Sequence, residues 1–170
     1  SVILWDLKRG RTARQWKTIR NSVNAFHRIA GGKQVVTVSD DDPYVDTRDV
    51  ETGELLQRWK WRPVTHSDVS RDGRRLLTRG KSEGGSVPCA VWDLQEGRRI
   101  SEWKEAGNVV FGGTCLSSDG RLVFSAFGRT DEMLSKISVR DAEAGREEAT
   151  WDGFGGELLG VDPEGRLMMT

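Results

Sequence analysis

The sequence predicts an all-β fold made of a repeated unit of four short strands, and two repeated spacings predict it. Four aspartates are each followed four residues later by a glycine and ten residues later by a tryptophan. A second template lies between these copies: a glycine, Lys or Arg, one free position, two apolar residues, then Ser or Thr. Four strands at a period of 43 to 48 residues indicate the blades of a β-propeller, whose core forms by packing blade against blade. The first template comprises Asp6, Asp49, Asp93 and Asp141 with Gly10, Gly53, Gly97 and Gly145 and with Trp16, Trp59, Trp103 and Trp151.

The stretch before each aspartate alternates in polarity, as a strand with one buried face should. The glycine four residues after the aspartate supplies the positive φ that a tight hairpin turn requires, most clearly in Glu51–Glu54. The strand after that turn is much more polar, which predicts an outermost strand whose charges discourage edge-to-edge pairing. Seven of the eight expected buried positions are apolar: Val2 and Leu4, Val45 and Thr47, Cys89 and Val91, Ile137 and Val139.

The second template predicts a turn that leads into a hydrophobic strand, at residues 32–37, 73–78, 120–125 and 165–170. The chain would therefore enter at the third strand of one blade, form three complete blades, and end within the second strand of another. We expect residues 1–170 to be about four blades' worth of strands from a longer propeller. The terminal halves could also combine as one blade and close a four-bladed ring, since propellers have four to eight blades.

Charge and composition restrict the function classes. Lys plus Arg equals Asp plus Glu at 26 each, which argues against nucleic-acid binding. No apolar segment approaches the roughly 18 residues of a membrane span, so no membrane partner is expected. Cys89 and Cys115 lack a paired spacing and fall in predicted strands, where a buried thiol behaves as a small hydrophobe. A reducing compartment, and hence a cytoplasmic location, is favoured.

No motif for catalysis or for a cofactor is complete. His27 and His66 share no metal-ligand spacing, and neither cysteine has an acid–histidine partner nearby. The run Asp40–Asp42 lacks the alternating ligands and the distal Glu of a calcium loop, and Gly31–Lys33 does not complete a phosphate-binding loop. We therefore expect no catalytic residue, no cofactor and no metal.

The repeat resembles the WD-repeat family. Trp5-Asp6 and Trp92-Asp93 carry the dipeptide of that family, and Ser70–Arg74 and Ser117–Arg121 match its S-x-D-G-R turn. The resemblance implies a β-propeller that acts as a rigid, non-catalytic platform for protein–protein contacts. Its partners would be other proteins, another domain of the parent chain, or the remaining blades.

The sequence also departs from that family. Arg48 and Arg140 replace the tryptophan in two units, where the long stem of an arginine can still cover apolar surface. The Gly-His pair of the family is missing, so its His–Ser–Asp–Trp hydrogen-bond network should be incomplete. The four tryptophans ten residues after each aspartate stand where the family has leucine, and we expect them to be packing anchors between blades.

Two other functions stay open, a quinoprotein-type propeller dehydrogenase and a propeller that binds calcium or a small ligand. The first repeats an Asp, a Thr-Gly turn and a closing Trp, although its tryptophan lies closer to the aspartate. For the platform function, the contact surface should lie in the loops of one rim, since propeller function is carried by such loops. Trp61-Arg62 has the composition of an interface hot spot. The expected rim residues are Asp40, Asp41, Trp61, Arg62, Arg129, Asp131 and Glu132.

Overall fold

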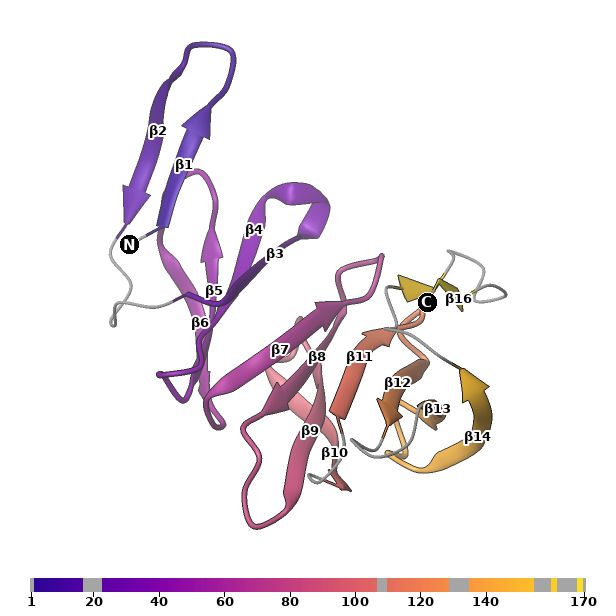
Figure 1. The fold of residues 1–170 in the computed structure, drawn as a ribbon. Coiled ribbons are helices and arrows are strands. Elements are labelled where there is room, and N and C mark those ends of the chain that lie inside the picture. The colour runs from indigo at the N-terminus through magenta and orange to yellow at the C-terminus, as the bar shows by residue number, and fades with distance from the viewer. Residues whose placement is uncertain are drawn as a thin grey trace. The chain divides into compact units, whose positions relative to one another are not determined.

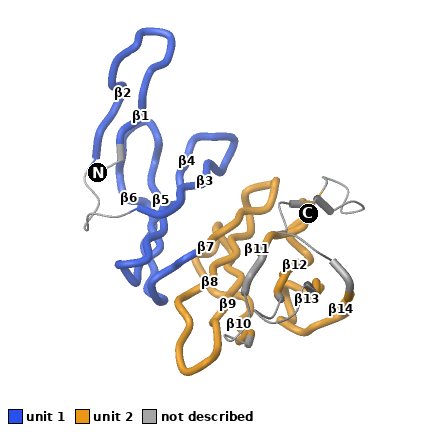
Figure 2. Tube along the Cα trace, viewed as in Figure 1, with its two compact units in different colours: residues 1–65 blue, residues 66–170 orange. Residues whose placement is uncertain are grey.

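The computed structural model describes residues 2–16, 23–106, 110–128, 135–154, 160–161 and 168–169. These residues form strands and turns with one short 3₁₀ turn, η1 (Ala30–Gly32) (Figure 1). The chain divides into two compact units, residues 1–65 and 66–170 (Figure 2).

The first unit contains a hairpin and a four-stranded sheet. The hairpin pairs β1 (Val2–Asp6) with β2 (Arg11–Trp16) in antiparallel fashion. The sheet follows the order of the chain, and its neighbouring strands are antiparallel. Its strands are β3 (Ala25–Ile29), β4 (Gln34–Val38), β5 (Tyr44–Asp49) and β6 (Leu55–Lys60).

The second unit contains two further four-stranded sheets and a short strand pair; its first strand, β7, begins two residues before the unit boundary. One sheet consists of β7 (Val64–Val69), β8 (Arg75–Gly80), β9 (Ser86–Asp93) and β10 (Arg98–Ala106). The next consists of β11 (Val110–Leu116), β12 (Leu122–Gly128), β13 (Ser135–Asp141) and β14 (Glu147–Phe154). The pair is β15 (Gly160–Val161) with β16 (Met168–Met169). Three four-stranded sheets with a two-stranded sheet at each end of the chain confirm the predicted fold class.

The aspartate of each unit closes the turn that follows it. Asp93 Oδ1 accepts hydrogen bonds from the backbone N–H groups of Gln95 and Glu96 at 2.9 and 3.0 Å. Asp141 holds its own turn in the same way, and Asp49 accepts the Thr52 N–H at 2.7 Å. These bonds explain why the aspartate is kept in all four units even where the preceding tryptophan is not.

Each outer hairpin carries a β-bulge at the same place. In the first hairpin the pairing shifts between Leu4 and Trp5, so that Leu4 lies opposite Arg14 and Asp6 opposite Arg11. Leu4 and Asp6 are two residues apart, so they lie on the same face of the hairpin, and each shares that face with its cross-strand partner. The bulge therefore puts Arg11 and Arg14 on one face, although they are three residues apart. The same shift recurs in the other hairpins, at Thr47/Arg48, Arg99/Ser101 and Val139/Arg140.

Most of the predicted buried positions lie in the core, whereas Leu4 is only half-buried. Val45, Cys89, Val91 and Ile137 are fully buried, and Thr47, the one polar member, is buried as well. In the second unit one apolar cluster draws on both four-stranded sheets, which is the blade-against-blade packing that a propeller requires. The cluster contains Leu77, Val87, Cys89, Val91, Trp103, Leu116, Val123 and Ala142.

The structure gives Trp103 and Trp151 different surroundings. Trp103 is 8% exposed, and the guanidinium of Arg140 from the next sheet lies 5.2 Å from its ring centroid. Trp151 is 40% exposed, since it lies on β14, an outer strand whose free edge has no neighbouring strand within the described parts of the chain. A tryptophan on an outer strand becomes an anchor only where another sheet covers it.

Candidate interaction surface

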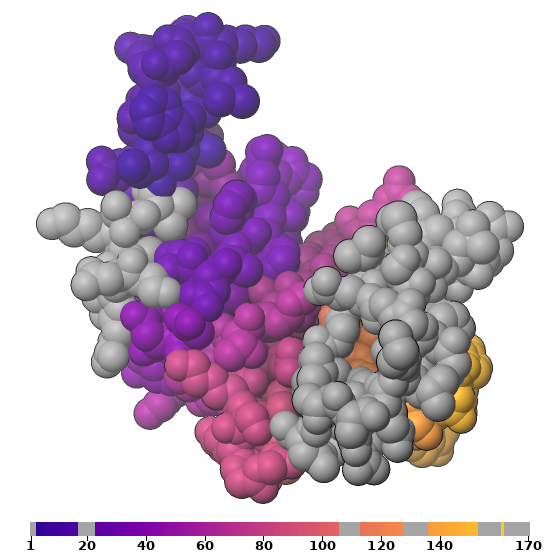
Figure 3. All heavy atoms as spheres, in the orientation of Figure 1, coloured from indigo at the N-terminus to yellow at the C-terminus, as the bar shows by residue number. Residues whose placement is uncertain are grey.

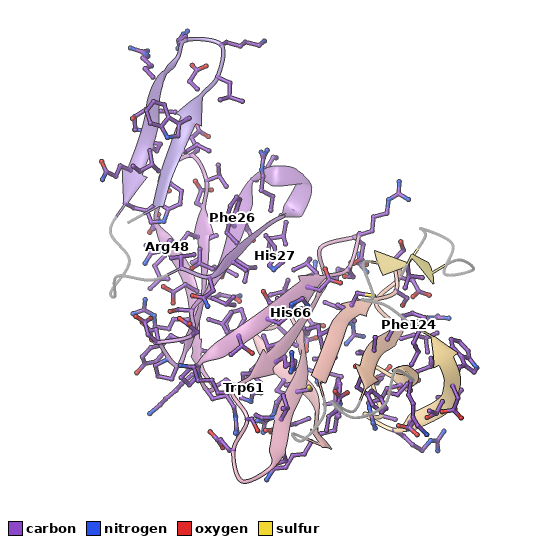
Figure 4. All side chains as sticks on the ribbon, viewed as in Figure 1. Phe26, His27, Arg48, Trp61, His66 and Phe124 are labelled. Carbon is purple, nitrogen blue, oxygen red and sulfur yellow. The ribbon has the colours of Figure 1, made fainter. Side chains whose placement is uncertain are left out.

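The structure brings four of the predicted rim residues together at one end of the β3–β6 sheet. There the β4–β5 loop meets the connection that follows β6. The backbone N–H of Trp61 donates to the Pro43 carbonyl at 2.8 Å, and that of Val64 donates to the Ser39 carbonyl at 2.6 Å. We call residues 39–43 and 61–63 the Trp61 rim; Trp61 is labelled in Figure 4. Asp40, Asp41, Trp61 and Arg62 all belong to it.

The side chains of the Trp61 rim combine an aromatic ring with charges of both signs. The Arg62 guanidinium lies 5.3 Å from the Trp61 ring centroid, a cation–π distance, and both residues are half-buried. On the neighbouring loop Asp41 is exposed, and its carboxylate accepts a hydrogen bond from the Ser39 hydroxyl. A partly buried Trp-Arg pair flanked by acidic groups is typical of an interface hot spot.

An ion pair fixes the strands below this rim. Arg58 of β6 donates two hydrogen bonds to the Asp46 carboxylate of β5, at 2.6 and 2.5 Å. The Asp46 carboxylate holds the pKa of the Arg58 guanidinium above its usual range through these bonds. Because a bidentate pair of this kind restricts both side chains, the rim stands on a rigid support. The other predicted rim residues, Arg129, Asp131 and Glu132, lie outside the described residues.

The second unit contains a polar network between its two sheets that the sequence did not reveal. Glu105 of β10 accepts hydrogen bonds from the Trp103 indole and from the Ser125 hydroxyl of β12, each at 3.0 Å. Arg140 donates to the Gly145 carbonyl at 2.9 Å while its guanidinium covers Trp103. Arg140 therefore replaces a tryptophan by covering apolar surface, as expected. The position of Glu105 carried no signal in the sequence, because its partner in the other sheet, Ser125, is 20 residues away along the chain.

One link of the family's tryptophan network is present. The Trp92 indole N–H donates to the Thr78 hydroxyl at 2.8 Å, and both residues are buried. Trp5 occupies the equivalent position in the first hairpin but is 56% exposed. The difference follows from the neighbouring strand: β8 covers Trp92, whereas β1 pairs only with β2 in the part of the chain that the structure describes.

His66, Asp68 and the two cysteines of the second unit have structural roles. His66 Nε2 lies 2.7 Å from the Thr114 carbonyl, and Asp68 accepts the Leu116 N–H at 2.8 Å, so two side chains of β7 tie this strand to β11. Burial raises the pKa of the Cys115 thiol to about 12 and raises that of Cys89 as well. A thiol in this state is a poor nucleophile.

Within the described ranges no three His, Cys, Asp or Glu side chains gather in a way that could hold a metal ion. No helix in those ranges has the length and apolar character that crossing a bilayer requires.

Comparison with solved structures identifies the architecture. The chain is similar to the crystal structure of the RRP9 WD40 repeats, with a TM-score of 0.63 and 13% identity over 81% of this chain and 40% of that one. It is also similar to hydrazine synthase from Kuenenia stuttgartiensis, with a TM-score of 0.71 and 14% identity over 96% of this chain and 53% of that one. The chain thus spans about half or less of each. No protein-family model and no curated protein sequence matches it.

At these identities the likeness shows the fold alone. The sheets are WD-like β-propeller blades, as the repeat predicted. One neighbour consists of WD40 repeats and the other is a synthase, so the fold is compatible with more than one kind of function.

Proposed function

We propose that the chain is a non-catalytic platform for contacts with other proteins. The observation that carries the proposal is the Trp61 rim, where Trp61 and Arg62 stand beside the acidic loop at one end of a rigid sheet. Aromatic and arginine side chains contribute most of the binding energy in protein interfaces. Half-burial holds both side chains in place, so little conformational entropy is lost when a partner binds.

Three further features support a binding role over catalysis. Both cysteine thiols have raised pKa values, which disfavours a nucleophilic thiolate. The His66 ring lies within hydrogen-bonding distance of the Thr114 carbonyl and so joins β7 to β11. The aspartates of the repeat accept hydrogen bonds from their own turns, which leaves them poorly placed for acid–base chemistry.

The experiment compares proteins that co-purify with the chain and with its rim variants. The substitutions Trp61→Ser and Arg62→Glu should remove a specific partner, because they delete the aromatic anchor and reverse its neighbouring charge. The matched control is Glu148→Lys, an exposed charge reversal in the second unit that lies outside both the Trp61 rim and the residues lining the pocket at the other end of the β3–β6 sheet. The proposal is wrong if the rim variants retain every partner.

A redox enzyme of the quinoprotein type is the second candidate, because one structural neighbour is a synthase. The discriminating measurement is the absorption spectrum of the purified protein. We expect only the band of the seven tryptophans and one tyrosine in the near ultraviolet. A bound chromophore that absorbs at longer wavelength would favour the enzyme instead.

A further inference from the structure

The first unit contains a groove at the end of the β3–β6 sheet opposite the Trp61 rim. It lies between the β1–β2 hairpin and two turns of the sheet, the β3–β4 turn and the β5–β6 turn, and encloses about 850 Å³. The Val50 N–H donates to the Lys33 carbonyl at 2.8 Å and so joins these two turns. The Trp16 ring packs against Gly53 in the β5–β6 turn, where a Cβ added to the glycine would lie 3.4 Å from the ring. This contact holds the hairpin against the turn. We call this space the hairpin groove; the hairpin is indigo in Figure 3.

Four basic side chains line the hairpin groove: Arg9, Arg11, Arg14 and Lys33. The β-bulge of the hairpin puts Arg11 and Arg14 on the face that lines the groove, together with Leu4 and Asp6. All four basic side chains are exposed, so their charged ends can reach a ligand. Leu4 and Val50 contribute half-buried apolar surface.

Three carboxylates also line the groove, Asp6, Asp49 and Glu51, so its four cations exceed its acidic groups by one. Asp6 and Asp49 accept hydrogen bonds from the backbone of their own turns, and the Thr52 N–H holds the pKa of Asp49 below its usual value. Arg9 lies 3.8 Å from Asp6. Within the described ranges, Arg11, Arg14 and Lys33 form no ion pair. Three cations therefore face the groove without a fixed partner there.

The hairpin groove lies between two neighbouring blades, and the equivalent interface in the second unit is closed. Ser101 is the counterpart of Arg14, eight residues after the aspartate, and its hydroxyl donates to the Ala142 carbonyl at 2.6 Å. Ala142 is the counterpart of Val50 in the groove. A short hydroxyl side chain thus joins the two blades directly, whereas its counterpart Arg14 lines an open groove.

A second groove, of about 470 Å³, lies in the second unit. Two of its arginines already have acidic neighbours, since Arg74 lies 3.9 Å from Asp72 and Arg121 lies 3.9 Å from Asp119. Its charges are therefore largely matched within the protein. The hairpin groove differs by having cations available for an external acidic ligand.

We propose that the hairpin groove binds an extended acidic peptide segment of a partner protein, with Asp or Glu side chains that pair with Arg11, Arg14 and Lys33. A groove of this volume is in the range of ligand-binding clefts. An extended peptide points alternate side chains to one side, so acidic residues at every second position would all face the cations of the groove. This surface is separate from the Trp61 rim, and either proposal can fail without the other.

The test is fluorescence anisotropy of a labelled peptide of about ten residues that alternates aspartate and valine, which is about 33 Å long in extended form. We expect saturable binding that weakens at least about tenfold between about 50 and 500 mM salt, because exposed ion pairs are screened. A peptide in which lysine replaces aspartate should not bind. No binding of the aspartate peptide at low salt would overturn the proposal.

The variants separate the groove from general charge effects. Arg11→Glu with Lys33→Glu should weaken peptide binding about tenfold or more, and Arg14→Ser about twofold to fivefold. The matched control, Arg74→Glu with Arg121→Glu in the second groove, carries the same change of charge and should leave binding unchanged. Circular dichroism establishes that each variant is folded.

Two results would contradict the inference. Equal loss of binding in the control variant would mean that net charge, not the hairpin groove, attracts the peptide. An oligonucleotide of the same charge that binds as tightly, and is weakened equally by the groove variants, would identify a general polyanion site in place of a peptide site.

Discussion

The Thr78–Trp92 hydrogen bond offers the sharpest test of how a blade is stabilised. Thr78 is fully buried, Trp92 is 4% exposed, and the indole N–H donates to the hydroxyl at 2.8 Å. Thr78→Val preserves the shape of the side chain but leaves the buried indole N–H without an acceptor. A buried donor that loses its partner costs about 1–3 kcal/mol. We expect the free energy of unfolding to fall by that amount.

A double-mutant cycle distinguishes the hydrogen bond from a change in packing. In a Trp92→Phe background no indole donor is present, so Thr78→Val should cost at least about 1 kcal/mol less than in the native chain. Thr78→Ser is the control, because it keeps the hydroxyl and removes one methyl group, worth about 1 kcal/mol.

Urea unfolding followed by far-ultraviolet circular dichroism measures each corner of this cycle, since a tryptophan signal would change with Trp92→Phe. Equal costs of Thr78→Val in the two backgrounds, within about 0.5 kcal/mol, would refute the hydrogen bond as a stabilising link.

Three other predictions follow from the turns and the thiols. Gly120→Ala should lower the free energy of unfolding by about 2 kcal/mol or more, because the new Cβ would lie 2.7 Å from Arg75 Cγ and the residue has a φ of +70°. Gly84→Ala is the control: that residue has a φ of +57° but open space around it, so the cost should be only about 1 kcal/mol. Equal losses in the two variants would contradict the clash at Gly120. The Ser117 hydroxyl and the Arg121 N–H lower the pKa of Asp119 from 3.8. The ionised carboxylate therefore stabilises the fold above pH 3.8, and this stabilisation disappears as the pH falls through the lower pKa of the folded state. The stability of Asp119→Asn should lack this loss at acid pH, and an acid-unfolding profile equal to that of the native chain would contradict the prediction. Cys89, which is buried and has a raised pKa, should react with a thiol reagent at about pH 8 only upon unfolding, and the half-buried Cys115, with a pKa of about 12, should react slowly in the folded protein. Rapid reaction of both thiols in the folded protein would contradict this prediction.

The features that the sequence predicted are those with local causes. The turn at Asp93–Gly97 depends on a carboxylate two residues before the amides that it binds and on a glycine with φ +64°. Alternating polarity predicted the buried positions Val45, Cys89, Val91 and Ile137, although β9 is buried on both faces from Val87 to Trp92. Both rules act within a few residues, so a spacing is enough to recognise them.

The features that the sequence could not predict depend on neighbours that are distant along the chain. Trp103 and Trp151 occupy the same position in the repeat, yet only Trp103 is covered, because the sheet that follows supplies Arg140. Arg14 and Ser101 are equivalent in sequence, but one lines an open groove and the other closes an interface. The bulge that aligns Arg11 with Arg14 carried no distinctive residue type.

The candidate surface was predicted in part. The composition of Trp61-Arg62 suggested an interface, and the structure places this pair beside the Asp40–Asp42 loop, as expected for loops of one rim. The hairpin groove was not predicted, because its cations are spread over two strands and a turn and look like ordinary surface charge in the sequence.

The most direct test of the platform function is hydrogen–deuterium exchange of the chain with and without a partner that co-purifies with it. We expect slower exchange of backbone amides at residues 39–43 and 61–63, the Trp61 rim, when the partner is bound. Exchange that stays unchanged at the rim, or protection confined to other parts of the blades, would contradict the proposal.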